Sequence, residues 1–272
     1  MTDIKYLEKK ATELRISVLK MIYHAKAGHI GGSFSSLDIL TVLYYHAMKM
    51  DVKNPDWEDR DRFVLSKGHI AESLWAILAD KGFIEKEELS TFSNFGTRLI
   101  GHPNNKVAGV EMNTGSLGHG LSVATGMAIA AKMDKKPYIS YTLMGDGELA
   151  EGSVWEAAMA AAHYKLDNLV AIIDCNGLQI SGTTEDVMHS GPLAAKWESF
   201  GWEVVTVDGH DIKHLVETLN QVSKINDKPT VIIANTTKTK GISMAENDPS
   251  WHHHVPTEAQ YEMALKELEA IL

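Results

Sequence analysis

The chain has 272 residues, 44% of them hydrophobic and 23% charged, a composition that suits one large α/β domain and excludes an intrinsically disordered protein. Its formal net charge of -10 opposes long-range attraction to nucleic-acid phosphates or anionic lipids, so local groups must hold any anion that it binds. The single cysteine, Cys175, excludes an internal disulfide bond, and the start MTDIKYLEKK carries charges where a signal peptide needs an apolar segment. These features predict a cytoplasmic protein with neither a nucleic-acid nor a membrane partner.

The first predicted element is a helix over about residues 4–27, where apolar residues recur at helical spacing before the turn-forming string AGHIGGS. Ser35, followed three residues later by Asp38, resembles a capping box. The apolar run LDILTVLYYHAMKM that accompanies it predicts a second, largely buried helix.

Short β-rich runs then alternate with helical segments. Strands are predicted over residues 62–66, 138–144, 169–174, 202–208 and 230–236. Helices are predicted over residues 70–82, 117–133, 152–165, 192–200 and 211–224, and over the final stretch TEAQYEMALKELEAIL. This alternation is typical of right-handed βαβ crossovers, so the predicted fold is an α/β, doubly wound parallel sheet with helices on both faces, in a single domain over residues 1–272.

The loop GDGELAEG follows the strand predicted at 138–144, at the sheet edge where open parallel sheets bind ligands. The backbone N–H of Gly147 is expected to face an anion there. The carboxylate of Asp146 would repel that anion unless a hard cation lay between them. One crossover further on, the side-chain amide of Asn176 and the backbone carbonyl of Leu178 offer oxygen ligands. The pattern therefore predicts a magnesium or calcium site.

This arrangement of strand, GDG, helix, strand and Asn resembles the signature of thiamine diphosphate enzymes, and the chain resembles the N-terminal domain of transketolases almost from end to end. The resemblance lies in segments that follow the family's order, namely AKAGHIGGSFSSLDILTVLYY, RDRFVLSKGHIAESLWAILADKGF, GHPNN, NTGSLGHGLSVATGMA and WHHHVPT. The chain departs from the family at Ile30, where proline is frequent, and at His119, where glutamine is usual. Both departures concern substrate contacts and leave the metal and diphosphate ligands in place.

The resemblance implies thiamine diphosphate and a divalent metal, Mg²⁺ or Ca²⁺, as cofactors. Asp146, Asn176 and the carbonyl of Leu178 would hold the metal, and Asn176 would also contact the cofactor. Gly147 and His69 would contact the diphosphate.

At the reactive end of the cofactor, the resemblance points to three histidines. His29, His102 and His252 match family histidines near the reactive carbon and the sugar hydroxyls, and His252 is expected to contact the cofactor as well. Imidazole groups suit this place because the transfer of a two-carbon ketol unit needs protons to leave and return near neutral pH.

Two further assignments come from the resemblance. The loop formed by Gly115, Ser116 and Leu117 would line the cofactor near its aminopyrimidine ring. Glu151 matches a family glutamate at the subunit interface that connects the two active sites.

The resemblance covers only the transketolase domain that holds the diphosphate and the metal. A separate C-terminal subunit with the pyrimidine-binding domain is therefore expected, in a two-fold symmetric heterotetramer that acts on sugar phosphates. The apolar, glycine-rich segment 112–131 is the predicted contact surface. The expected function is that of an N-terminal subunit of a transketolase, active only with this partner.

Other functions remain open. Gly145, Gly147 and Ala150 satisfy the G-x-G-x-x-G/A fingerprint, and Asp174 ends the next strand as a ribose-binding acid would, which suits an NAD-dependent oxidoreductase. Asp146 argues against this function, because its carboxylate would repel a pyrophosphate that carries no metal. Within the thiamine family the alternative is a 1-deoxyxylulose-5-phosphate synthase, and a non-catalytic scaffold is a third possibility. Taken singly, the loop residues could also be ordinary helix caps and turns.

Overall fold

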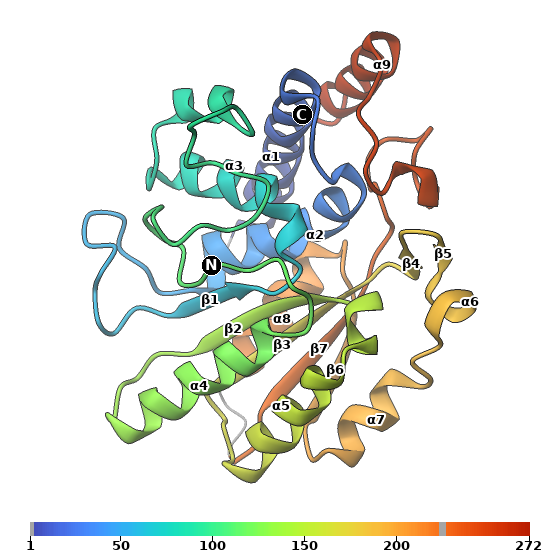
Figure 1. The fold of residues 1–272 in the computed structure, drawn as a ribbon. Helices are drawn as coiled ribbons and strands as arrows, with labels where there is room; N and C mark the ends of the chain where they lie inside the picture. The colour runs from blue at the N-terminus through green and yellow to red at the C-terminus, as the bar shows by residue number, and fades with distance from the viewer. Residues whose placement is uncertain (1–2, 223–226) are drawn as a thin grey trace.

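The computed structural model describes residues 3–222 and 227–272, and within these ranges five parallel strands form one sheet (Figure 1). The strand order is β1-β2-β3-β7-β6, and every neighbouring pair is parallel. The bounds are β1 (Arg62–Leu65), β2 (Ser140–Gly145), β3 (Leu169–Cys175), β6 (Glu203–Asp208) and β7 (Thr230–Asn235). The five predicted strands are therefore confirmed, with ends that shift by one or two residues.

Helices cover both faces of the sheet, which confirms the doubly wound architecture (Figure 1). Along β3, Val170 and Ile172 belong to one hydrophobic core, whereas Ala171 and Ile173 belong to the other. This alternation makes the strand apolar at every position, as parallel sheets require. The first core is closed by α1 (Ile4–Ala25), α2 (Ile30–Val42), α3 (Ala71–Lys81), α8 (Ile212–Val222) and α9 (Glu258–Glu269). The second is closed by α4 (Gly120–Met133), α5 (Gly152–His163) and α7 (Leu193–Ser199).

The capping box predicted at Ser35 and Asp38 is wrong. Helix α2 begins at Ile30, so both residues lie inside it and are buried. Asp38 instead forms an ion pair with Arg15 of α1, at 2.7 Å between its Oδ2 and the guanidinium Nη2. The helix begins earlier than the local pattern suggests because its first turn is held by a residue far away in the sequence, described below.

Most other helix ends differ from the predictions by one to three residues. The helix predicted over 211–224 is α8, and its predicted residues 223–224 lie outside the described part of the chain. Helix α9 begins with a capping box in which Thr257 and Gln260 each bond the other's backbone N–H. Shorter elements that the pattern did not predict are η1 (Leu43–Ala47), η2 (Gly68–Ile70), η3 (Lys86–Thr91), η4 (Gly147–Ala150), β4 (Leu178–Gln179), β5 (Gly182–Thr183), α6 (Thr184–Met188) and η5 (Pro249–Trp251). Among the residues that the structure describes, no helix has the length and apolar character needed to cross a bilayer.

Candidate cofactor site

A cavity of about 270 Å³ lies where the carboxyl ends of the parallel strands meet the first turn of α2. Loops that follow β1, β2, β3 and β7 all contribute to its wall. Most of the site residues predicted from the sequence line it, namely His29, His69, Gly115, Leu117, Asp146, Gly147, Asn176, Leu178 and His252. Segments that are more than 200 residues apart in the chain thus meet at one place.

The predicted metal ligands meet on one wall of this cavity. Asp146 is buried, and its two carboxylate oxygens accept the backbone N–H groups of Gly147, at 2.9 Å, and Gly177, at 2.7 Å. Burial and, after it, the nearby charge of Asp174 raise the pKa of Asp146 to about 6. A cation beside Asp146 would stabilise the charged carboxylate and so lower its pKa again.

The other two predicted ligands carry oxygens of the same hard type. The amide nitrogen of Asn176 donates to Asp174 at 3.2 Å, and its amide oxygen accepts the backbone N–H of Leu178 at 3.1 Å and has a second lone pair for a metal. The described residues contain no group of three or more His, Cys, Asp or Glu side chains that could hold a metal. One carboxylate, one amide and the carbonyl of Leu178 therefore fit Mg²⁺ or Ca²⁺ in the presence of a diphosphate.

Two lysines that line the cavity were not predicted from the sequence. The ammonium of Lys238 donates to the carbonyl of Leu178 at 3.3 Å and hydrogen-bonds with Nδ1 of His252 at 3.0 Å. Burial, followed by the charge of Lys67, lowers the pKa of Lys238 to about 8. Two cations beside a cavity in an acidic protein favour an anionic ligand. The sequence did contain a signal for both lysines, because each closely follows a predicted strand, in the loops SKGH and TTKTKG.

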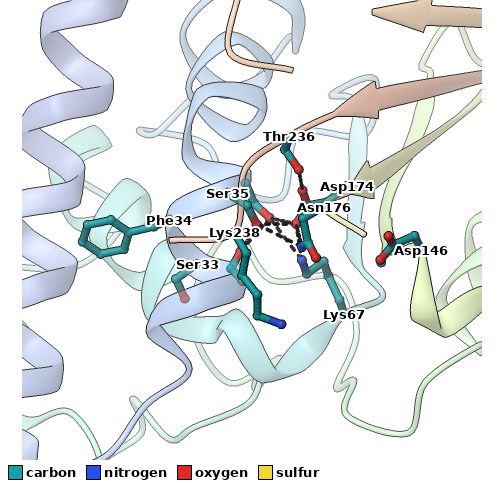
Figure 2. Close-up of polar contacts among 12 residues, drawn as sticks. Ser33, Phe34, Ser35, Lys67, Asp146, Asp174, Asn176, Thr236 and Lys238 are labelled. Carbon is teal, nitrogen blue, oxygen red and sulfur yellow. Dashed lines mark hydrogen bonds and ion pairs between the residues drawn. The ribbon is translucent and has the colours of Figure 1, made fainter. Parts of the chain in front are cut away.

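Asp174 is the buried centre of the polar contacts behind the cavity. Figure 2 shows Ser35, Lys67, Asn176 and Thr236 converging on its carboxylate, which is 0% exposed. Burial by itself would raise the pKa of Asp174, but the ion pair with Lys67 and the hydrogen bonds bring it below the usual value. This carboxylate is satisfied by groups of the chain and is closed to a ribose, so the structure gives no support to the dinucleotide-binding alternative.

The histidines form a cluster over the cavity. The ring centroid of His29 lies 5.0 Å from that of His69, 5.6 Å from His252 and 4.5 Å from His253. Burial above all lowers the pKa of His29 to about 4 and that of His252 to about 3, and it lowers the pKa of His69 well below its usual value. The lowered pKa values favour the uncharged imidazoles, which can hydrogen-bond to hydroxyl groups.

Three predicted residues lie outside the cavity lining. His102 lies at its rim, where the ring Cδ2 is 2.9 Å from the position that a Cβ on Gly115 would take. Because Gly115 also has φ +153°, a side chain at this position would be strained and would collide with His102. Ser116 and Glu151 are exposed, and Glu151 stands directly before α5. Their roles remain predictions.

Glu148 is a further residue of the site that sequence reasoning missed. Its buried carboxylate accepts the backbone N–H groups of Gly118, at 2.8 Å, and Gly145, at 3.0 Å, as well as the hydroxyl of Ser66. It thereby ties the loops after β1 and β2 to the turn that precedes α4. Its position inside GDGELAEG was visible in the sequence, but the inward direction of its side chain was not.

Together the fold and the cavity define an α/β domain with a polar ligand site at the carboxyl ends of its parallel strands. A family model described as "Transketolase, thiamine diphosphate binding domain" matches residues 7–267. The chain belongs to the transketolase family. Transfer of a ketol group is the general reaction of that family.

Individual relatives agree with this assignment. The chain is 50% identical to one of the named subunits of the apulose-4-phosphate transketolase of Phocaeicola vulgatus, over 98% of this chain and 95% of the relative. It is 43% identical to the 6-deoxy-6-sulfo-D-fructose transketolase subunit SqwG of a Clostridium species, over 97% and 96% of the two chains. Among solved structures, transketolase from Campylobacter jejuni superposes with a TM-score of 0.93 at 34% identity, over 98% of this chain but only 43% of the other. The chain thus matches whole subunits of some relatives and less than half of a single-chain transketolase.

Proposed function

We propose that this chain is the cofactor-binding subunit of a two-polypeptide transketolase that moves a two-carbon ketol unit from a ketose phosphate to an aldose phosphate. The observation that carries the proposal is the cavity itself. It combines the oxygen ligands of Asp146, Asn176 and Leu178 with the ammonium groups of Lys67 and Lys238, which is the donor set that a metal-bound diphosphate needs.

In this proposal the chain holds the polar end of the cofactor. Asp146, Asn176 and the Leu178 carbonyl hold Mg²⁺ or Ca²⁺, while His69 and Gly147 contact the diphosphate. Thiamine diphosphate, when bound, supplies the carbanion chemistry that breaks and forms the carbon–carbon bond. The protein's share of catalysis is positioning and the movement of protons.

His29, His102 and His252 are the groups to which we assign the movement of protons. The low pKa values of His29 and His252 keep both imidazoles neutral, so each can hydrogen-bond to a substrate hydroxyl. Because the ammonium of Lys238 donates to Nδ1 of His252, the neutral ring carries its proton on Nε2, which can donate a hydrogen bond to the substrate. The nearness of His29 and His252 to His69 supports this assignment.

The partner in this proposal is a C-terminal subunit that carries the pyrimidine-binding domain, in a heterotetramer of two copies of each chain. Two relatives of similar length are themselves named as subunits of a transketolase, which supports a partner of this kind.

Segment 112–131 remains our candidate contact surface, because Met112 is 42% exposed and Gly126 of α4 has open space around the position of a Cβ. Glycine inside an exposed helix costs about 1 kcal/mol relative to alanine, and close approach of a partner would account for it. Glu151, exposed nearby before α5, is assigned to the same interface. The single cysteine, which permits no internal disulfide bond, is in keeping with the cytoplasmic location that we propose.

The purified chain alone should transfer no ketol group, because the pyrimidine half of the cofactor site would be missing. Addition of the partner subunit should restore turnover in a coupled assay with a ketose phosphate donor and an aldose phosphate acceptor. The proposal fails if the chain alone turns over robustly and mass spectrometry finds no copurified partner.

Alanine substitution should separate the histidines into two groups in the assembled enzyme. His29→Ala, His102→Ala and His252→Ala should depress kcat more than cofactor affinity, because these side chains act on the substrate or the reactive carbon. His69→Ala should instead raise the cofactor concentration needed for half-maximal activity. The exposed His163 of α5 provides the control, and its alanine variant should match the wild type. The reverse pattern in steady-state kinetics would contradict this division of roles.

A further inference from the structure

Glu72 is a completely buried acid of α3 that lies behind His29, outside the cavity lining. Its Oε1 accepts the backbone N–H of His29 at 2.5 Å and the hydroxyl of Ser33 at 3.0 Å. Its Oε2 is buried and has no hydrogen-bond partner among the described residues. Neither the cofactor ligands nor the proton-transfer groups described above account for a charged side chain in this place.

Glu72 provides a side-chain hydrogen-bond acceptor at the N-terminus of α2, where the N-cap residue itself provides none. His29 is the N-cap residue of this helix, and its own side chain makes no capping hydrogen bond. Glu72, 43 residues further along the chain, brings a carboxylate to that helix N-terminus, where negative charge is favourable. Gly28 packs against the same group, because a Cβ on Gly28 would lie 3.2 Å from Oε1 of Glu72 and 2.6 Å from Cγ1 of Ile22.

The turn that Glu72 holds forms one wall of the cavity. It carries the His29 ring and Gly32, and a Cβ on Gly32 would lie 3.4 Å from the ammonium of Lys67 and 3.6 Å from Nε2 of His69. Figure 2 shows Ser33 and Ser35 leaving α2 in different directions, with Ser35 directed toward Asp174. The first turn of α2 is therefore fixed at two points, by Asp174 on one side and by Glu72 on the other.

We propose that Glu72 is a positioning residue, whose carboxylate oxygen fixes the backbone of His29 and the hydroxyl of Ser33 so that the His29 imidazole faces the reactive end of the cavity. The effect of Glu72 on kcat rests on the proposed function, whereas its effect on the position of the His29 ring does not. The polar groups that face Glu72 are His29 and Ser33 of α2, and burial raises the pKa of Glu72 to about 7.

Two substitutions separate the acceptor role from simple filling of space. Glu72→Gln keeps a side-chain oxygen of the same size that accepts both hydrogen bonds, whereas Glu72→Leu fills the space and removes the acceptor. In the isolated chain with ¹³C-labelled histidine, the His29 resonance, assigned from its loss in His29→Gln, should stay in place in the Gln variant and shift in the Leu variant. In the assembled enzyme, Leu should lower kcat by about 10- to 100-fold with little change in the cofactor dissociation constant, and Gln should restore most of that loss.

The pH dependence of stability gives an independent readout. A carboxyl whose pKa is raised in the folded chain binds more protons there than in the unfolded chain, so its contribution to stability declines as pH rises from about 4.5 to about 7. The melting temperature of Glu72→Gln should therefore rise relative to the wild type between pH 5 and pH 8.

The position of the His29 resonance decides the proposal even if the enzyme proves not to be a transketolase, because that measurement needs no activity. An unshifted His29 resonance in a folded Leu variant, or equal shifts in the Gln and Leu variants, would overturn it. If the Leu variant does not fold, Ser33→Ala provides the second test. It removes one of the two hydrogen bonds that Oε1 of Glu72 accepts, so the His29 resonance should shift, and an unshifted resonance in the folded variant would overturn the proposal.

Discussion

Asp146→Ala should abolish metal-dependent binding of thiamine diphosphate by the assembled enzyme. The side chain is the one carboxylate in the proposed ligand set, so its removal takes away the charged ligand of the metal. Even the loss of an outer-sphere partner typically weakens metal binding by about 10- to 100-fold, and the loss of this ligand should exceed that. Isothermal titration calorimetry with Mg²⁺ and the cofactor measures the effect directly.

The same substitution should also alter the pH dependence of stability of the isolated chain. Because burial and Asp174 raise the pKa of Asp146 to about 6, the folded wild-type chain holds this proton more tightly than the unfolded chain. Its stability should therefore decline by about 3 kcal/mol between about pH 4 and pH 7, and the variant should lack that decline. Asp134→Ala, at an exposed position after α4, is the control and should change neither measurement. Unchanged cofactor affinity in Asp146→Ala would disprove the metal assignment.

Asp174→Ala should destabilise the chain by about 3–5 kcal/mol, because it would leave the ammonium of Lys67 buried without its counter-charge. The donors on Ser35, Asn176 and Thr236 would lose their acceptor as well. Each buried donor without a partner adds a desolvation cost. Urea denaturation followed by circular dichroism gives the free energy of unfolding.

A double-mutant cycle tests whether Asp174 and Lys67 act as a pair. Lys67→Met alone should also be destabilising, since it leaves the Asp174 carboxylate buried without its cation. The double variant, Asp174→Ala with Lys67→Met, should lose less stability than the sum of the two single variants. Simple additivity would show that the two charges do not depend on each other.

The fold could be predicted to a large extent because its signals are local and periodic. β3 and β7 are apolar at almost every position, and turn residues follow each of them, so their place inside a parallel sheet can be read from the sequence. The start of α2 could not be read in this way, since its first turn is held by Glu72 through a contact between residues 43 positions apart. Ser35 carries the side chain of a helix cap but serves as a donor to Asp174.

The candidate site was predictable where a motif specifies the backbone. Asp146 and Asn176 end neighbouring strands, so their convergence follows from the topology of the sheet. The direction in which a side chain points cannot be read from such a motif. Lys67 and Glu148 lie within motifs that the sequence displays, yet only the packed structure shows that both side chains turn inward.

The cavity contains two groups whose pKa values move toward neutrality from opposite sides. That of Asp146 rises to about 6, and that of Lys238 falls to about 8. A cation that binds at Asp146 displaces a proton at mildly acidic pH, whereas an anion that binds beside Lys238 draws a proton from solvent at mildly basic pH. Under the proposed function, loading of the metal and the cofactor should therefore be coupled to the exchange of protons with the buffer. The direction of this exchange reverses between mildly acidic and mildly basic solution.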